Sequence, residues 1–88
     1  MARTKKHAKI AATLVPYQEY FIINRGKREG VEVFDTYLLQ GEIPQAKLEV
    51  YRVEEEIAYV KLVWKADQCK PLCVGQDMTL LDGEDGTN

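Results

Sequence analysis

IINRGKREGVEVFDTYLL, residues 22–39, is the stretch that decides the fold, because it places a polar loop between two apolar segments of strand character. The loop, residues 24–30, carries charged side chains that are unfavourable to bury and therefore lies at the surface. It also holds residue types that tolerate the positive φ of a sharp exit from a strand, namely Asn24, Gly26 and Gly30. We therefore predict a structural turn between two strands.

The charged residues of this loop allow a second interpretation. Glycines combined with cations can hold a phosphate, but neither GxxxxGK[ST] nor GxGxxG is present, and the loop leads into a strand rather than a helix. A structural turn is therefore preferred. The functional alternative is a binding surface made by Arg25, Lys27, Arg28 and Tyr51. The apolar residues after the loop are predicted to point inward: Val31, Val33 and Phe34.

Alternation of apolar and polar residues continues on both sides of the loop. It predicts strands at residues 8–15, 19–24 and 36–40, and a closing segment at residues 72–81. The sequence is therefore typical of an all-β protein, and we predict a small antiparallel barrel or rolled sheet of five or six strands.

Residues 46–65 form the longest regular segment. One face would hold Ala46, Leu48 and Val50, and later Ala58, Val60, Leu62 and Trp64. Apolar residues also recur at the three- and four-residue spacing of a helix. The β-branched content, the sustained alternation and the lack of a helix N-cap favour a long hairpin, with Glu54, Glu55 and Glu56 at a solvated tip.

The chain of 88 residues has a formal charge of −2 and room for one domain. We expect that domain at residues 8–81, between a disordered basic tail at 1–7 and a disordered acidic tail at 82–88. No apolar run is long enough to cross a bilayer, and no secretory signal is recognisable, so membrane insertion is not expected. As written, the chain would stay in the cytoplasm, but an excised domain would give no information about localisation.

Two segments share a pattern of a valine, an acidic residue and an apolar run, at residues 33–39 and 74–81. We interpret the likeness as recurring turn chemistry and not as a true repeat. In each, the acidic residue, Asp35 or Asp77, is expected to bond to turn amides, and Gly75 belongs to the second turn.

The order of these motifs resembles the small C-terminal β-barrel domain of flagellar assembly protein T and related bacterial envelope proteins. The likeness rests on an N-x-G-x-x-x-G-V loop at residues 24–31, a V-x-V-x-D-x-Y step at 31–37, a hairpin arm at 48–53 and a closing element at 74–77. Phe34 replaces the usual glycine, and Gln76 is inserted before Asp77. The resemblance implies a non-enzymatic module of the periplasm or envelope that acts through protein–protein contacts, with no catalytic residues.

The sequence holds little material for catalysis or metal binding. Cys69 and Cys73 form a C-x3-C pair, but zinc requires four ligands and His7 lies far away in the chain, so no metal site is predicted. A disulfide is possible in an exported protein, and free thiols are expected in the cytoplasm. There is no serine, and we predict neither catalytic residues nor a cofactor. Trp64 and the tyrosines offer a recognition surface as the functional alternative, but on alternating strands we assign them to core and cross-strand packing.

Nucleic-acid binding is the second class of function. A basic loop with Arg25, Lys27 and Arg28 would act there with Tyr17, Tyr20 or Tyr51. The acidic pI of 5.4 makes this interpretation the less favoured one. The expected partner is therefore a protein. The sequence specifies neither the identity of that partner nor the oligomeric state of this chain.

Overall fold

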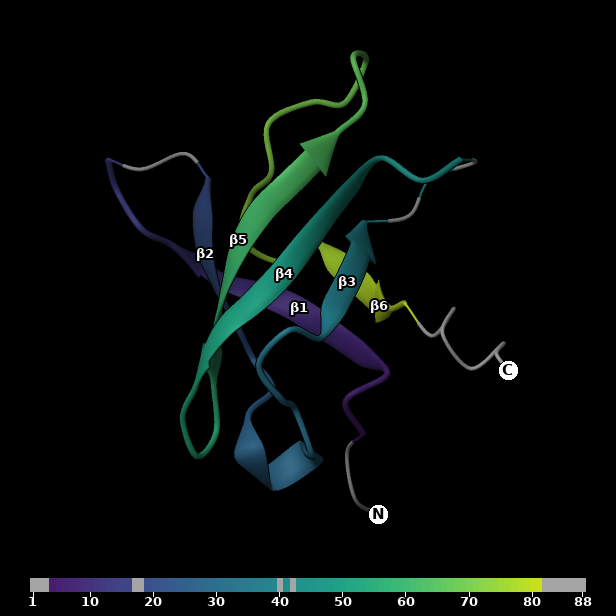
Figure 1. Ribbon diagram of the computed structural model, residues 1–88. Helices are drawn as coiled ribbons and strands as arrows, with labels where there is room; N and C mark the ends of the chain where they lie inside the picture. Colours follow the sequence, from purple (N-terminus) through teal and green to yellow (C-terminus); the bar gives the residue numbers. More distant parts are fainter. Residues whose placement is uncertain (1–3, 17–18, 40, 42, 82–88) are drawn as a thin grey trace.

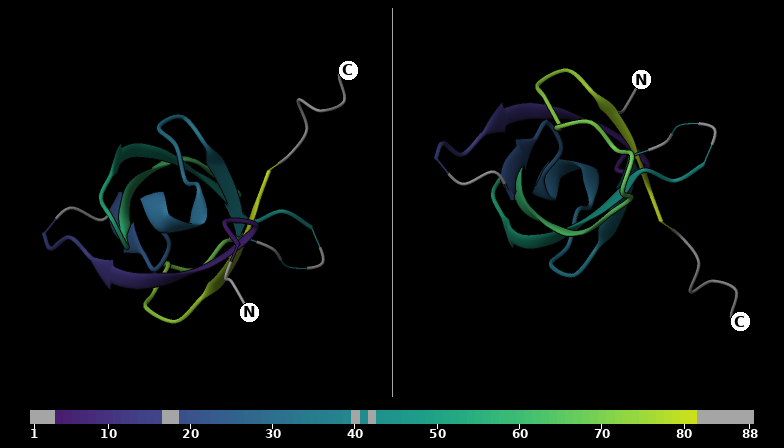
Figure 2. Two further views of the ribbon diagram at one scale, coloured as in Figure 1. Left: turned by 90° about the horizontal axis from the view of Figure 1, so that it is seen from below. Right: turned by 90° about the horizontal axis from the view of Figure 1, so that it is seen from above.

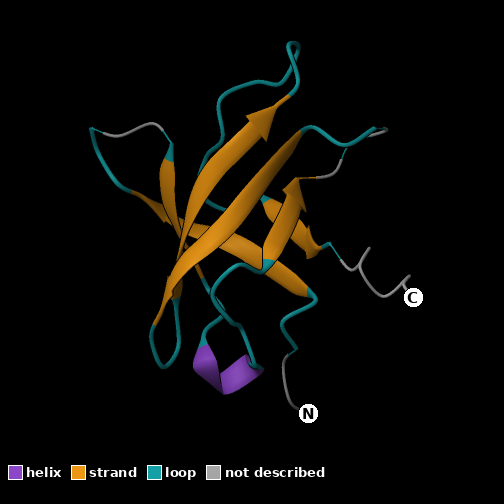
Figure 3. Cartoon of the chain, in the orientation of Figure 1, coloured by secondary structure: helices purple, strands orange, loops and turns teal. Residues whose placement is uncertain are grey.

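The computed structural model describes residues 4–16, 19–39, 41 and 43–81. The described chain is all-β and forms a closed barrel with the strand order β1-β2-β5-β4-β3-β6, in which every neighbouring pair is antiparallel. Figure 1 shows how the strands wrap around one interior, and Figure 3 shows a short helical turn below them. The predicted antiparallel barrel is confirmed, with six strands.

The elements are β1 His7–Thr13, β2 Tyr20–Ile23, the 3-10 turn η1 Lys27–Glu29, β3 Thr36–Leu39, β4 Ala46–Val53, β5 Ala58–Lys65 and β6 Asp77–Leu80. The hairpin predicted at residues 46–65 is confirmed as β4 and β5, and the helical alternative is excluded. The predicted first strand ends two residues early, at Thr13. The closing strand is shorter than predicted, because residues 73–76 form a turn before it.

Alternation builds the core as expected along β4, where Ala46, Leu48 and Val50 are fully buried. Burial of each aliphatic side chain contributes roughly 1.5–3 kcal/mol. The predicted core position of Trp64 is wrong, because the β4–β5 register shifts so that Lys47 pairs with Trp64 while the next residue of β4 pairs with Leu62. This irregularity turns Trp64 outward, and 44% of its surface is exposed.

The two halves of the chain, β1–β3 and β4–β6, have the same pattern of strand pairing. If β1, β2 and β3 are exchanged with β4, β5 and β6, every strand pair becomes a pair that is also present in the barrel. The hairpins β1–β2 and β4–β5 correspond, and the pairs β2–β5 and β3–β6 each correspond to themselves, so the pairing scheme has a pseudo-two-fold symmetry. Figure 2 shows the ring of strands along the barrel. The likeness between residues 33–39 and 74–81 therefore extends to the whole topology, beyond the turn chemistry to which we assigned it.

Corresponding turns precede β3 and β6 and pair with the middle of a strand in the other half. The amide of Phe34 donates to the Val50 carbonyl at 2.9 Å, and the Val50 amide donates to Asp35 at 2.8 Å. At the second turn, the amide of Gly75 donates to the Ile10 carbonyl at 2.8 Å, and the Ile10 amide donates to the Gln76 carbonyl at 3.0 Å. Each half of the chain is thereby fixed to the other.

A side chain of each turn also accepts a bond from its own backbone. Asp35 Oδ2 accepts from the Glu32 amide at 2.9 Å, and Gln76 Oε1 accepts from the Cys73 amide at 2.8 Å. The turn bond predicted for Asp77 is therefore made by Gln76. The Asp77 carboxylate instead pairs with Lys9 Nζ at 2.7 Å on the surface, where an ion pair contributes little stability.

The turns differ at the residue that needs a positive φ. Gly75 has φ +95°, as glycine readily does, but the corresponding Phe34 has φ +80°. The prediction that Val33 and Phe34 point inward is wrong: both are exposed, and 76% of the Phe34 surface is accessible. A bulky residue in this region is strained by about 1–3 kcal/mol.

Residues 4–7, assigned from sequence to a disordered tail, pack against the barrel. The Tyr37 hydroxyl donates to the Lys5 carbonyl at 2.6 Å, and Lys5 Nζ pairs with Asp35 at 3.2 Å. The Leu80 amide donates to the Lys6 carbonyl at 2.8 Å, and His7 begins β1. The prediction of a disordered tail is therefore wrong for residues 4–7, because these residues take part in the contacts by which β1 and β6 close the barrel. The rest of the tail prediction concerns residues 1–3 and 82–88, which lie outside the described residues.

Candidate functional site

The loop at residues 24–30 folds onto the acidic tip of the β4–β5 hairpin. The amides of Lys27 and Arg28 donate to the carbonyls of Glu54 and Glu55 at 2.8 and 3.0 Å. The Arg28 guanidinium also pairs with the Glu56 carboxylate at 2.9 Å. The tip predicted to be a solvated turn is thus the partner of the basic loop, and together they close one end of the barrel. We call this the η1 end, and Figure 2 shows η1 across it from below.

Position 26 requires a glycine because the hairpin tip approaches it closely, and not because of its φ angle. Its φ is −147°, so the positive φ predicted for Gly26 is wrong, whereas Gly30 does have φ +90°. A Cβ on Gly26 would lie 2.5 Å from the Glu54 carbonyl oxygen and from the Ile57 amide nitrogen. Among the described residues, positive φ occurs at Gly30, Phe34 and Gly75, and Asn24 is therefore not one of these positions.

Asn24 and Arg25 fix the same loop to the N-terminal segment. Asn24 Oδ1 accepts from the Lys9 amide at 2.9 Å, and Arg25 Nε donates to the Thr4 carbonyl at 2.9 Å. Arg25 also donates to the Asn24 carbonyl at 3.0 Å. Asn24 therefore contributes to the loop through a side-chain hydrogen bond and not through a positive φ, and Arg25 has a structural role. The bonds of Arg25 and Arg28 run to the N-terminal segment, to the loop itself and to the hairpin tip, and none of them involves Tyr51.

Tyr51 belongs to a cluster on the outside of the barrel. Its ring meets the Tyr20 ring edge-on, with centroids 5.7 Å apart, and lies 6.2 Å from the Tyr59 ring. Since the three tyrosines come from β4, β2 and β5, they span three adjacent strands. We call Tyr20, Tyr51 and Tyr59 the aromatic wall. The expected cross-strand packing of tyrosines thus occurs, but on the outer face.

A cation and exposed apolar side chains lie around the aromatic wall. The Arg52 guanidinium lies 5.4 Å from the centre of the Tyr59 ring, a cation–π distance. Tyr51 remains 43% exposed, and Val63 and Trp64 are exposed further along β5. Burial raises the pKa of the Tyr51 phenol, and the nearby Tyr20 and Tyr59 raise it further. The phenol is therefore a neutral donor and acceptor at physiological pH.

Metal chemistry has no assembled site in the described part of the chain. No group of three or more histidine, cysteine, aspartate or glutamate side chains that could hold a metal occurs in it. Both cysteines are free thiols: Cys69 is half-buried against the core and Cys73 is exposed. Asp35, a carboxylate in the turn before β3, is engaged by Lys5 and by the Glu32 amide.

We expect the double variant Cys69→Ala/Cys73→Ala to fold, with a loss of no more than about 2 kcal/mol, because only one of the two thiols contributes to packing. Urea denaturation with and without a reducing agent measures this. Failure of the variant to fold, or one equivalent of zinc in the purified wild type, would contradict it.

Comparisons with protein-family models, with curated proteins and with solved structures give no match for this chain. Within the residues that the structure covers, no helix has the length and apolar character that crossing a membrane requires.

Sequence reasoning named Tyr51 and, for the nucleic-acid alternative, Tyr20, but it did not predict that these two and Tyr59 form one cluster. The parity of the hairpin already put Tyr51 and Tyr59 on the outer face, so that signal was present. Tyr20 joins them only because β2 pairs with β5, with Tyr20 opposite Lys61 and Ile22 opposite Tyr59. That pairing is non-local and has no signature in the sequence.

Proposed function

We propose that this protein is a non-enzymatic protein-binding module that uses the aromatic wall to contact its partner. The observation that carries the proposal is the clustering of Tyr20, Tyr51 and Tyr59 with Arg52 on one outer face. Tyrosine and arginine are among the residues that dominate the binding energy of protein interfaces. Tyrosine offers a large contact area with little loss of conformational entropy.

We propose Phe34 as a second contact, apart from the aromatic wall, beside a recess that it lines with Lys5, Leu80 and Leu81. The turn before β3 is bonded to Val50 on β4, and the Phe34 side chain is exposed although its backbone is strained. Strained residues persist where the rest of the structure holds them, and they are concentrated at binding and active sites. Contact with a partner would explain why the turn before β3 has an aromatic residue at the position where the turn before β6 has Gly75.

The proposal places the module in a bacterial envelope protein. This part rests on the resemblance to the C-terminal domain of flagellar assembly protein T, which implies such a setting. Antibody detection of the endogenous protein in periplasmic, membrane and cytoplasmic fractions tests it. Recovery in the cytoplasmic fraction alone would remove the envelope assignment and leave the binding surface to be judged separately.

The test of the binding surface begins with cross-linking and capture of partners from cell extract by the wild-type protein. The captured partner is then purified, and its affinity is measured for the wild type, for Tyr51→Ala/Tyr59→Ala and for the control Lys47→Ala on the outside of β4. We expect the double variant to bind at least about 30-fold more weakly, as for loss of an interface hot spot, and the control to bind normally. Equal affinity of all three proteins would overturn the proposal.

Phe34→Gly is expected to raise the free energy of unfolding by about 1 kcal/mol, because relief of the strained φ exceeds the entropy cost of a glycine. The same variant should bind the partner more weakly. Urea denaturation and the affinity measurement together separate function from structure. A variant that is more stable and binds as well as the wild type would exclude Phe34 from the binding surface.

Nucleic-acid binding through Arg25, Lys27 and Arg28 remains the alternative proposal. The bonds of Arg25 to backbone carbonyls and the Arg28–Glu56 ion pair weigh against it, because they occupy the cations that phosphates would need. Fluorescence anisotropy with a labelled single-stranded oligonucleotide distinguishes the two. Tight binding with a steep salt dependence that is lost in Lys27→Ala/Arg28→Ala would favour the nucleic acid.

A further inference from the structure

The two ends of the barrel are related by the pseudo-two-fold but are filled differently. The β2–β3 connection and the β4–β5 tip, which close the η1 end, correspond to the β5–β6 connection and the β1–β2 connection. At the η1 end these segments are in direct contact through the amides of Lys27 and Arg28, and Val31 is buried behind them. We call the opposite end the open end.

At the open end the described parts of the corresponding segments line a groove of about 410 Å3. Val15 and Pro16 form one side, and Pro71 and Leu72 form the other. Leu72 is half-buried there, whereas the corresponding Val31 at the η1 end is buried in the core. The fold therefore leaves an apolar recess at one end that its own chain fills at the other.

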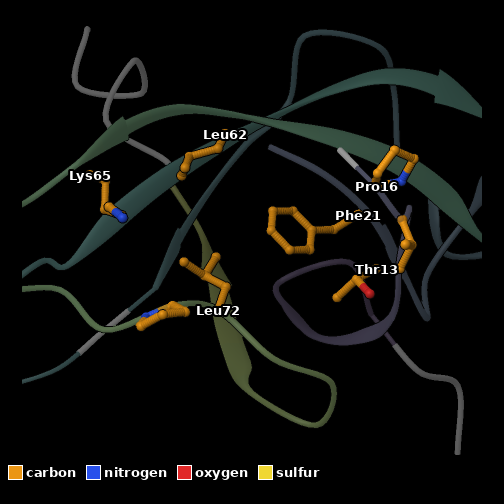
Figure 4. A pocket seen from close by; sticks show the side chains of 8 residues that line it. Thr13, Pro16, Phe21, Leu62, Lys65 and Leu72 are labelled. Atoms are coloured by element: carbon orange, nitrogen blue, oxygen red, sulfur yellow. The ribbon is translucent and has the colours of Figure 1, made fainter. Parts of the chain in front are cut away.

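The floor and rim of the groove have distinct chemistry. Figure 4 shows the Phe21 ring facing the space between Leu62 and Leu72, with Lys65 on one side of the opening and Thr13 on the other. The volume lies at the lower end of the range for small-molecule sites, roughly 300–1,000 Å3. Such sites are mainly apolar, with a few polar groups that orient the ligand.

Lys65 supplies the polar group that selects the ligand. Over the described ranges the ion pairs involve Lys5, Lys9, Arg28 and Arg52, and Lys65 makes none of them. One ammonium at an apolar recess matches one negative charge, whereas a phosphate is usually held by several donors or by a bidentate arginine. We propose that the groove binds a small monocarboxylate with an apolar body, of the fatty-acid class.

In the bound state the apolar chain would lie against Phe21, Leu62 and Leu72, and the carboxylate would accept a hydrogen bond from Lys65 Nζ. Burial of the chain supplies the main driving force, roughly 25 cal/mol for each Å2 of apolar surface removed from water. The ion pair sets the preference for an anion and contributes less, since it stays near solvent. The groove and the aromatic wall involve different residues, so this inference does not rest on the proposed function.

Octanoate is the probe, with octylammonium as the charge-reversed control and octan-1-ol as the neutral one, each titrated into the wild type and followed by heteronuclear NMR. We expect octanoate to bind more tightly than octylammonium and to shift the amides of Phe21, Leu62, Lys65 and Leu72. No saturable binding of octanoate, equal binding of the two ions, or shifts confined to the aromatic wall would each overturn the proposal.

Two exposed positions test the role of charge without disturbing the core. Lys65→Gln should weaken octanoate binding about two- to fivefold and leave octan-1-ol unchanged, which is the effect of one solvent-exposed ion pair. Lys61→Gln on the same strand lies outside the groove and is the matched control. Val15→Glu should reverse the preference toward octylammonium. An equal loss of octanoate affinity in Lys61→Gln and Lys65→Gln would overturn the assignment of Lys65.

Discussion

Gly26→Ala is expected to destabilise the protein by about 3 kcal/mol, the upper part of the range for an overpacked site. The new Cβ would lie 2.5 Å from two backbone atoms of the hairpin tip, the Glu54 oxygen and the Ile57 nitrogen. Backbone cannot rotate away as a flexible side chain can, so the η1 loop must separate from the tip. Urea denaturation monitored by circular dichroism measures the loss.

Gly75→Ala is the matched control, because Gly75 has a positive φ and open space around it, whereas Gly26 has an ordinary φ and a close backbone approach. The φ of Gly75 is +95°, and a Cβ there would meet no atom within 4 Å. Only the strained backbone opposes the change, and we expect a loss of about 1 kcal/mol. If Gly75→Ala were as destabilising as Gly26→Ala, the close approach at the η1 end would not explain the requirement for Gly26.

Tyr37→Ala should have an effect of similar or larger size, about 3–5 kcal/mol. Tyr37 is fully buried and is the largest side chain of the core, and its hydroxyl holds the N-terminal segment through the Lys5 carbonyl at 2.6 Å. Tyr37→Phe keeps the ring and isolates that bond, for which about 1 kcal/mol is expected. A loss in Tyr37→Phe equal to that in Tyr37→Ala would show that the ring does not contribute to the core.

Tyr37 also gives stability a dependence on alkaline pH. Burial, and then the charge of Asp35, raises the pKa of the Tyr37 phenol above its ordinary value of 10.0. The folded protein therefore keeps a proton that the unfolded chain releases. Full stability is present below about pH 10 and decreases above it by up to about 1.4 kcal/mol per pH unit. Urea titrations across this range should show a smaller decrease for Tyr37→Phe.

Local patterns predicted the parts of the fold that depend on neighbouring residues. Alternation found the strands of the β4–β5 hairpin, because burial of one face repeats every second residue. Glycine chemistry identified Gly30 and Gly75 as turn positions. The requirement for Gly26 was expected for the wrong reason, since a close approach to residues 54–57 is a tertiary contact that no local pattern reveals.

The candidate site was harder to predict, because it depends on which strands become neighbours. The sequence grouped Arg25, Lys27 and Arg28 by their proximity in the chain, whereas Arg28 pairs with Glu56 on a distant hairpin. Phe34 resembled a core residue by its hydrophobicity, but its positive φ directs it outward.

The order of strands in the barrel bears on how the protein folds during synthesis. Four of the six strand pairs join the two halves of the chain, and β6 closes the ring by pairing with β1, as in the contact between Lys9 and Asp77, 68 residues apart. Contacts so distant in sequence slow folding, because the loop must be closed before they form. While β6 is still in the ribosome, the edges of β1 and β3 are unpaired and available to other nascent chains. Chaperone binding to emerging chains should therefore persist until residue 80 leaves the exit tunnel.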